Sequence, residues 1–188
     1  MLEKIKTIIK EGNRFLITTH IDPDGDAIRS VLSLYWVLES MNKIPLIYLK
    51  DSIPYRYNFL PQPPNILHEF SADLFDGIFI LDCGNLSRIG DGHEVLNNKG
   101  TIINIDHHNT NELFGSFNLV DEAASSTAEI LYRLYMSLNI SFTHNISINL
   151  YTAIFTDTGS FRYENTNAHA FHICEEMIHN GVNPSYVS

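Results

Sequence analysis

Four segments of this 188-residue sequence concentrate carboxylate and imidazole side chains. The residues concerned are His20, Asp24, Asp26, Asp82, Asp106, His107, His108 and Asp157. Imidazole and carboxylate together suit Mn²⁺, Mg²⁺, Fe²⁺ or Zn²⁺, and the absence of thiolates from the set argues against a structural zinc site. Four of these carboxylates with two of the imidazoles are already more ligands than one catalytic ion needs. They fit two ions about 3.5–4 Å apart that share one bridging carboxylate.

A pair of divalent ions also resolves the electrostatic problem that such a group creates. Carboxylates packed together repel one another, so they hold protons and their pKa values rise. Bound divalent cations become the largest local charges and reverse this effect. An acidic pocket that holds two cations can therefore present a positive face to phosphate.

The elements expected around these segments indicate an α/β fold. Apolar and β-branched runs predict strands over residues 15–19, 44–49, 77–81 and 101–105. Helical spacing of apolar residues predicts helices over residues 2–10, 27–40, 126–139, 146–155 and 167–180. Because strands alternate with helices, we expect a largely parallel β-sheet flanked by helices. Three of the four strands end at His20, Asp82 or Asp106, and ligands gather at the carboxyl ends of such strands.

Composition limits the classes of protein to which the chain can belong. Lysine and arginine number 12 against 22 acidic residues, a net charge of −10, which argues against gripping long duplex nucleic acid by charge alone. The two cysteines, Cys83 and Cys174, are too few for a disulfide scaffold. No apolar run approaches the roughly 20 residues of a membrane helix, and residues 1–10 lack the apolar core of a signal peptide. We expect a cytoplasmic protein with no membrane partner.

Each acidic or histidine residue also has a simpler explanation when it is taken alone. An aspartate after a strand often caps a helix, and Asp26 directly precedes the predicted helix at Ala27. Asp-Gly is a common turn, and a single histidine is more often structural than a metal ligand. The site interpretation is favoured because four separate segments supply such residues, each at the end of a predicted strand or helix.

In this order the four segments resemble the motifs of the DHH phosphoesterase family. The motifs are residues 19–28 (Thr-His-Ile-Asp-Pro-Asp-Gly-Asp-Ala-Ile), Asp82, Asp106-His107-His108 and Asp157-Thr158-Gly159, and the resemblance extends from about Phe15 to Tyr163. The Pro-Asp-Gly-Asp form of the first motif is most similar to the nanoRNase branch. Members of this branch are bifunctional oligoribonucleases that also remove a phosphate from 3′-phosphoadenosine 5′-phosphate. Family II inorganic pyrophosphatases are similar but usually have threonine at the position of Gly25.

The resemblance implies a role for each residue of the site. His20 and Asp24 would hold one ion, Asp26, His107 and Asp157 the second, and Asp82 would bridge the two. Asp106 would fix the ring of His107, and His108 would face the substrate phosphate or donate a proton. The ions, expected to be Mn²⁺ with Mg²⁺ as an alternative, would activate a water for in-line attack on phosphorus.

The implied activity is hydrolysis of short oligonucleotides or nucleotide 3′-phosphates. Two alternatives stay open: a hydrolase of pyrophosphate, polyphosphate or cyclic dinucleotides, and a non-catalytic module that senses a metal or nucleotide. Further candidate substrate contacts are Arg88, Ser125, Ser126 and Arg162. The alternatives for these are a loop or surface role for Arg88, capping of a helix by a serine, and an exposed salt bridge for Arg162.

Two features depart from the family pattern. Arg29 stands where the first motif normally has glycine, so its side chain is expected beside the proposed ions. There it would clash, compete with a cation or contact phosphate. The second feature is length: residues 1–182 are expected to form the DHH catalytic domain and residues 183–188 the start of an interdomain linker, with the C-terminal substrate-binding domain absent. A homodimer is left open.

Overall fold

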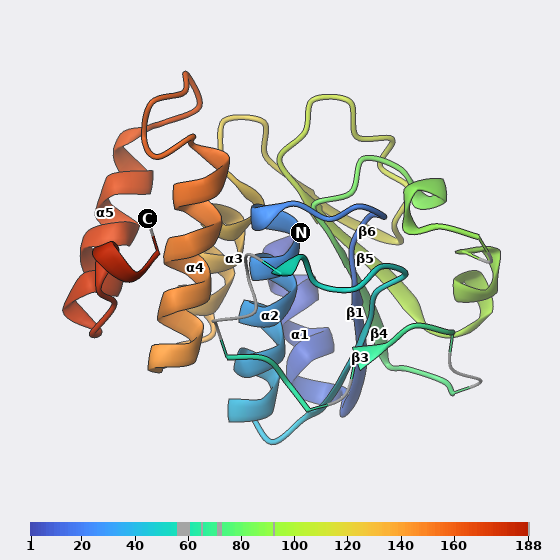
Figure 1. Ribbon diagram of the computed structural model, residues 1–188. Coiled ribbons are helices and arrows are strands. Elements are labelled where there is room, and N and C mark those ends of the chain that lie inside the picture. The colour runs from blue at the N-terminus through green and yellow to red at the C-terminus, as the bar shows by residue number, and fades with distance from the viewer. Residues whose placement is uncertain (56–60, 65, 71–72, 92, 188) are drawn as a thin grey trace.

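The computed structural model describes residues 1–55, 61–64, 66–70, 73–91 and 93–187. Within these residues six strands form one sheet in the order β3-β2-β1-β4-β5-β6 (Figure 1). Every neighbouring pair is parallel. The strands are β1 (Arg14–Thr18), β2 (Ile44–Tyr48), β3 (Ile66–Leu67), β4 (Gly77–Leu81), β5 (Thr101–Asp106) and β6 (Phe117–Val120). The prediction of an α/β fold with a parallel sheet is therefore confirmed.

The five α-helices of the described residues all lie on the same side of the sheet (Figure 1). They are α1 (Leu2–Glu11), α2 (Gly25–Ser40), α3 (Thr127–Ser137), α4 (His144–Asp157) and α5 (Ala168–His179). Helix α4 packs on α2, and α5 packs on α4, so the helices form more than one layer. None of the helices in the described residues is long and apolar enough to span a membrane.

The two faces of the sheet are buried by different partners. Phe79 and Leu81 of β4 join the large core beneath the α-helices. Ile78 and Ile80, which alternate with them, belong to a smaller cluster with residues of two 3₁₀-helices, η2 (Leu86–Ile89) and η3 (His93–Asn98). Successive side chains of a strand point to opposite faces, so both sets can be fully buried. This double burial explains why β4 is an uninterrupted apolar run.

The strand order places the carboxyl ends of β1, β4 and β5 side by side. The chain passes from β1 to β2 in one direction and later returns to pair β4 with the other edge of β1. Such a switch point leaves a crevice at the carboxyl ends of the strands, where ligands bind in open parallel sheets. His20 follows β1, Asp82 follows β4, and Asp106 ends β5. Three neighbouring strands therefore deliver the polar segments to one crevice.

The elements predicted from sequence differ from the observed ones mainly at their ends and in two short strands. Neither β3 nor β6 was expected, since a two-residue strand and a half-buried edge strand carry little apolar signal. Helix α2 begins at Gly25, two residues earlier than predicted, because Asp24 rather than a later residue caps it. An additional 3₁₀-helix, η4, spans Pro184–Tyr186. Residues 52–65, whose four prolines are typical of a long connection, lie partly outside the described residues.

Candidate metal centre

The carboxylate of Asp82 is aimed by a turn at the end of β4. Asp82 has a φ of 53°, a left-handed conformation that is uncommon for a residue other than glycine. Its backbone N–H still donates to the carbonyl of Ile105 at 3.0 Å, so the strand pairing continues up to the turn. The residue is 1% exposed. Strained backbone of this kind is concentrated at functional sites.

The N-terminal turn of α2 supplies two carboxylates with different tasks. Asp24 is the N-cap, and its carboxylate accepts a hydrogen bond from the Ala27 N–H. Asp26, which sequence reasoning regarded as a candidate cap of this helix, instead reaches across to α3. There it accepts hydrogen bonds from the N–H groups of Thr127 at 2.7 Å and Ala128 at 3.3 Å. Because a helix N-terminus carries partial positive charge, this contact favours the ionised form of a buried carboxylate.

The six residues that sequence analysis assigned to metal binding come together in the crevice. The Nε2 atom of His107 lies 3.6 Å from Asp82 Oδ1 and 3.6 Å from Asp157 Oδ2. It also lies 4.0 Å from Asp26 Oδ2. On the other side of Asp82, His20 Nε2 lies 4.0 Å from Oδ2. The two oxygens of Asp82 thus face two different imidazoles.

The ligand-type atoms form overlapping groups whose members lie within 4.8 Å of one another. These groups are His20, Asp24 and Asp82; Asp26, His107 and Asp157; and Asp82, His107 and His108. The chemistry of these donors fits divalent cations. The buried Nε2 of His107 has no hydrogen-bond partner among the described residues, although three carboxylates surround it. The Nδ1 of His20 lies 2.6 Å from the Ile21 carbonyl, an arrangement that leaves Nε2 available as a ligand.

Without a cation, three carboxyl groups of the site, those of Asp26, Asp82 and Asp157, hold a proton more readily than an ordinary aspartate does. Burial raises the pKa values of Asp26 and Asp82 well above the usual range, and the charges of neighbouring aspartates raise them further. Burial and the charge of Asp24 raise the pKa of Asp157 to about 6. Burial lowers the pKa of His107, so its imidazole favours the neutral form that binds metals. The cluster therefore takes up either protons or cations.

Asp106 has a different partner from the one that was expected. Sequence analysis placed this carboxylate behind the ring of His107, whereas its Oδ1 contacts Nδ1 of His108 at 2.7 Å. It also accepts from the backbone N–H of His107 at 2.8 Å and from Asn111 Nδ2 at 2.6 Å. Asp106 therefore fixes the turn that carries both histidines but orients only the second ring.

The contact with Asp106 determines the proton chemistry of His108. Hydrogen bonding to Asp106 raises the pKa of His108. Burial would raise the pKa of Asp106, but hydrogen bonds from His108 and Asn111 outweigh that effect and lower it. The His108 side chain is 41% exposed, in contrast to 12% for His107. His108 is therefore the histidine of the pair that can meet a substrate.

Two residues that sequence analysis did not single out bind carboxylates of the site. The Thr127 hydroxyl donates to Asp82 Oδ1 at 3.0 Å, and both side chains are buried. Asn165 Nδ2 donates to Asp157 Oδ2 at 3.0 Å and to the Ser125 carbonyl at 2.9 Å. Neither residue has a metal-ligand side chain or lies in a strand-end cluster. Only the folded structure reveals these contacts, which join Thr127 to Asp82 over 45 residues and Asn165 to Asp157 over 8.

The four candidate substrate residues divide into two buried and two exposed ones. Ser125 and Ser126 are fully buried, and Ser126 is the N-cap of α3, accepting from the Glu129 N–H at 3.3 Å. Because both serines are buried, neither side chain is exposed to a substrate in this structure. Ser126 instead has the alternative role of a helix cap. Arg88 lies exposed on η2, and Arg162 is exposed with its Nε bound to the Gly159 carbonyl at 2.8 Å. The salt bridge considered for Arg162 is replaced by this backbone contact.

Arg29 does not project into the crevice. Its side chain is fully buried between α2 and α4, where Nη1 lies 3.4 Å from Asn149 Oδ1. A side chain with no exposed surface cannot contact a substrate phosphate, so that alternative is wrong for this structure. The Arg29 side chain instead fills space between the two packed helices.

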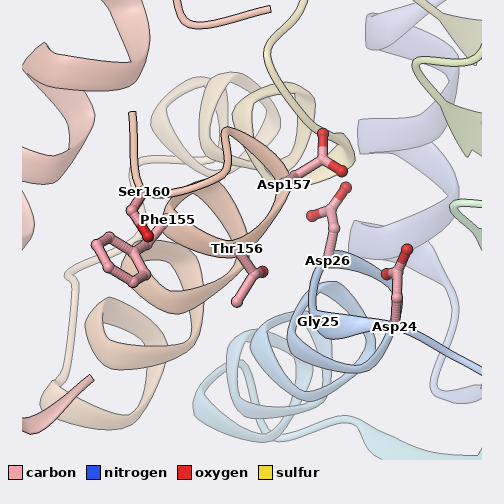
Figure 2. Close-up of a pocket in the computed structure, with 7 residues that line it drawn as sticks. All are labelled: Asp24, Gly25, Asp26, Phe155, Thr156, Asp157 and Ser160. Atoms are coloured by element: carbon pink, nitrogen blue, oxygen red, sulfur yellow. The ribbon is translucent and has the colours of Figure 1, made fainter. Parts of the chain in front are cut away.

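A cavity of about 340 Å³ opens beside the cluster, between the start of α2 and the end of α4 (Figure 2). Asp24, Asp26 and Asp157 line one end of it. Phe155, Thr156 and Ser160 line the remainder. The carboxylates are thus accessible to a ligand larger than an ion.

Comparisons with known proteins connect this geometry to a family. Residues 14–156 match the DHH family, N-terminal domain. The chain is 37% identical over 171 residues to the bifunctional oligoribonuclease and PAP phosphatase NrnA of Thermus thermophilus, covering 88% of this chain and 50% of that protein. It is 27% identical to the Bacillus subtilis protein of the same description, covering 94% and 56%. The chain thus spans about half the length of these curated relatives.

Solved structures show the same fold. A crystal structure of an exopolyphosphatase-related protein from Bacteroides fragilis matches with a TM-score of 0.91 and 27% identity, covering 99% of this chain and 58% of that one. A putative family II inorganic pyrophosphatase from Methanococcus jannaschii matches with a TM-score of 0.66 and 19% identity, which indicates the fold alone. Since the family match covers most of the sequence and a relative at 37% identity spans nearly all of it, the chain belongs to the DHH family.

Proposed function

We propose that this domain hydrolyses phosphoester bonds of short oligonucleotides or of nucleotide 3′-phosphates such as 3′-phosphoadenosine 5′-phosphate, with two divalent ions. The observation that carries the proposal is the position of Asp82, whose two carboxylate oxygens face His20 and His107 at 4.0 and 3.6 Å. A carboxylate shared in this way is the bridging element that a two-ion site requires. The substrate class is supported by the relatives described as bifunctional oligoribonuclease and PAP phosphatase.

Each ion of the proposed pair has its own protein ligands. His20 and Asp24 would hold one, Asp26, His107 and Asp157 would hold the other, and Asp82 would be the carboxylate shared between them. Mn²⁺ is the proposed metal, as the family resemblance implies, and imidazole nitrogen with carboxylate oxygen suits it among several divalent ions. When bound, two such ions lower the pKa of a water and neutralise charge that develops on the phosphoryl group.

His108 is proposed as the proton donor to the leaving oxygen. Its ring is the more exposed of the pair, and the hydrogen bond with Asp106 raises its pKa, so that it carries a proton nearer to neutral pH. Asp106 supports this role by holding Nδ1 at 2.7 Å, so Nε2 is the ring nitrogen proposed to donate the proton.

The organisation of the full protein also enters as a proposal. We place the catalytic domain at residues 1–182 and the start of a linker at residues 183–188, with recognition of the nucleotide shared with a further domain, as the greater length of the relatives suggests. Arg88 and Arg162, both exposed, remain proposed phosphate contacts. The proposed compartment is the cytoplasm.

One assay separates the candidate functions. Turnover of a dinucleotide, of 3′-phosphoadenosine 5′-phosphate and of pyrophosphate is compared with and without Mn²⁺. Mn²⁺-dependent cleavage of either of the first two supports the proposal. Preference for pyrophosphate would favour the alternative that the exopolyphosphatase-related neighbour suggests. Mn²⁺ binding without turnover of any substrate would indicate a module that senses a metal or a nucleotide.

A further inference from the structure

The cavity beside the carboxylates is larger than a pair of ions needs. An aromatic ring lines its far end. Figure 2 shows Asp24, Asp26 and Asp157 gathered at one end and the Phe155 ring lying away from them, beside Ser160. The volume of about 340 Å³ falls within the range of small-ligand pockets. A ligand that fills it meets charge at one end and an aromatic ring at the other.

The Phe155 ring is held in place by other rings rather than free to turn. Tyr151, one turn earlier on α4, stacks on it at 6.1 Å between ring centroids. Phe161 meets it edge-on at 5.6 Å and in turn stacks on Phe171 of α5 at 5.0 Å. Aromatic contacts of this kind fix ring orientation. Phe155 is half-buried, so part of its surface stays available to the cavity.

The turn after α4 has a strained backbone that shapes this end of the cavity. Gly159, Ser160 and Phe161 are three consecutive residues with positive φ, at 56°, 59° and 63°. This conformation is costly for a bulky residue such as phenylalanine. Thr158 holds the turn through its hydroxyl, which accepts from the Phe161 N–H at 3.2 Å. As a result Ser160 lines the cavity and Phe161 contacts Phe155.

We propose that Phe155 is a stacking platform for the nucleobase of a nucleotide whose phosphate lies at the carboxylate end of this cavity. Every base has an apolar face that stacks on aromatic rings, and proteins bind single-stranded nucleic acid by pairing such rings with sites for phosphate. An acidic pocket attracts phosphate only through bound cations, so the ring gives the site an affinity for nucleotides that bare phosphates lack. This inference rests on the proposed function for the position of the phosphate.

Equilibrium binding tests the platform independently of turnover. The probes are adenosine 5′-monophosphate, ribose 5-phosphate and a 2-aminopurine nucleotide, each with Mn²⁺. Loss of a stacked base corresponds to about fivefold to 150-fold weaker binding. We expect Phe155→Leu to weaken binding of adenosine 5′-monophosphate by at least about fivefold. Binding of ribose 5-phosphate should not change, and stacking should quench 2-aminopurine fluorescence in the unsubstituted protein but not in the Phe155→Leu variant.

Two further variants keep the result interpretable. Phe171→Leu is the matched control, because Phe171 belongs to the same run of rings but is 55% exposed on α5 and does not line the cavity. It should retain the preference for the nucleotide, and Phe155→Trp should restore both that preference and the quenching. Equal affinity of the unsubstituted protein for the two phosphates, or an equal effect of Phe155→Leu on both, overturns the platform. Mn²⁺-dependent turnover measured alongside tests the proposed function separately, so either idea can fail without the other.

Discussion

Thr127 binds two carboxylates of the candidate metal centre at once. Its hydroxyl donates to Asp82 Oδ1 at 3.0 Å, while its backbone N–H donates to Asp26 Oδ2 at 2.7 Å. One residue at the start of α3 therefore sets the relative positions of the proposed bridging ligand and of a ligand of the second ion. Partners of metal ligands contribute to affinity because they hold the donor atoms in place before the ion arrives.

Thr127→Val tests this positioning role. Valine keeps the shape and the backbone N–H but removes the hydroxyl, so Asp82 loses a buried hydrogen bond. We expect Mn²⁺ affinity to fall about 10- to 100-fold, with the Asp26 contacts retained. Isothermal titration calorimetry measures the affinity. Thr152→Val is the control, since the buried Thr152 hydroxyl donates to the Ile148 carbonyl within α4. Equal losses in the two variants would mean that the effect is structural.

Asp82→Asn should lower Mn²⁺-dependent turnover more than Arg88→Ala does. The change weakens the ligands of both proposed ions at once, whereas Arg88 is exposed on η2. We expect a loss of more than about 100-fold for Asp82→Asn, since losing even a partner of a metal ligand costs 10- to 100-fold. Initial rates with a dinucleotide at several Mn²⁺ concentrations measure both effects. The reverse order of the two variants contradicts the bridging assignment.

The sequence was sufficient to predict that the ligand-type residues lie at one edge of the sheet. Parallel strands share the direction of their carboxyl ends, so His20, Asp82 and Asp106 had to lie near one another once their strands were recognised. No comparable rule predicts which polar residues at the start of α3 or in the turn after α4 hydrogen-bond to the ligands. Thr127 and Asn165 contact Asp82 and Asp157 across segments 45 and 8 residues apart. Threonine and asparagine are common in caps and turns, and nothing in the neighbouring sequence marks Thr127 and Asn165 as partners of the ligands.

Where the structure differs from the expectations for Asp26 and Asp106, the difference lies in which group the side chain contacts, whereas Arg29 also lies in a different place. Asp26 was correctly located at the start of α2, but its acceptor oxygens serve α3, because the two helix N-termini converge on the crevice. Asp106 lies next to both histidines in sequence, and only the turn geometry determines that it meets His108. Arg29 lies about one turn after Asp26 on α2, deeper between α2 and α4, where its guanidinium meets Asn149. Side-chain direction thus depends on tertiary packing that the sequence pattern leaves undetermined.

Asn165→Ala should weaken the hold on Asp157. Asn165 Nδ2 donates to Asp157 Oδ2 at 3.0 Å, and this hydrogen bond lowers the pKa of that carboxyl group. Without the donor, the pKa of Asp157 should rise above its value of about 6. Because a metal must displace the proton, Mn²⁺ affinity should then decline at a higher pH than in the unsubstituted protein. Calorimetric titrations across pH measure this shift. Asn183→Ala, which alters the cap of η4, should leave the profile unchanged.

The thermal stability of the metal-free chain should increase as pH falls from about 7.5 to 5. Asp157 has a folded pKa of about 6 against an ordinary value of 3.8, so its charge destabilises the folded state above pH 6. As pH falls through that value, the folded state takes up a proton that the unfolded state does not yet bind. Asp26 and Asp82 act in the same direction because their pKa values are also raised. His108, whose pKa is raised, likewise adds stability as it becomes protonated, while His107, whose pKa is lowered, opposes the trend.

Bound Mn²⁺ should reverse this dependence, since the cation replaces the protons on the same groups. Melting temperatures measured with a chelator and with Mn²⁺ should therefore differ most at the higher pH. Asp157→Asn is the matched variant, because it removes one titrating group while keeping the side-chain shape. Its metal-free protein should show a shallower increase in stability on acidification. A metal-free protein that loses stability steadily from pH 7.5 to 5, or an Asp157→Asn variant with an unchanged slope, would show that repulsion among these carboxylates does not control the stability of the fold.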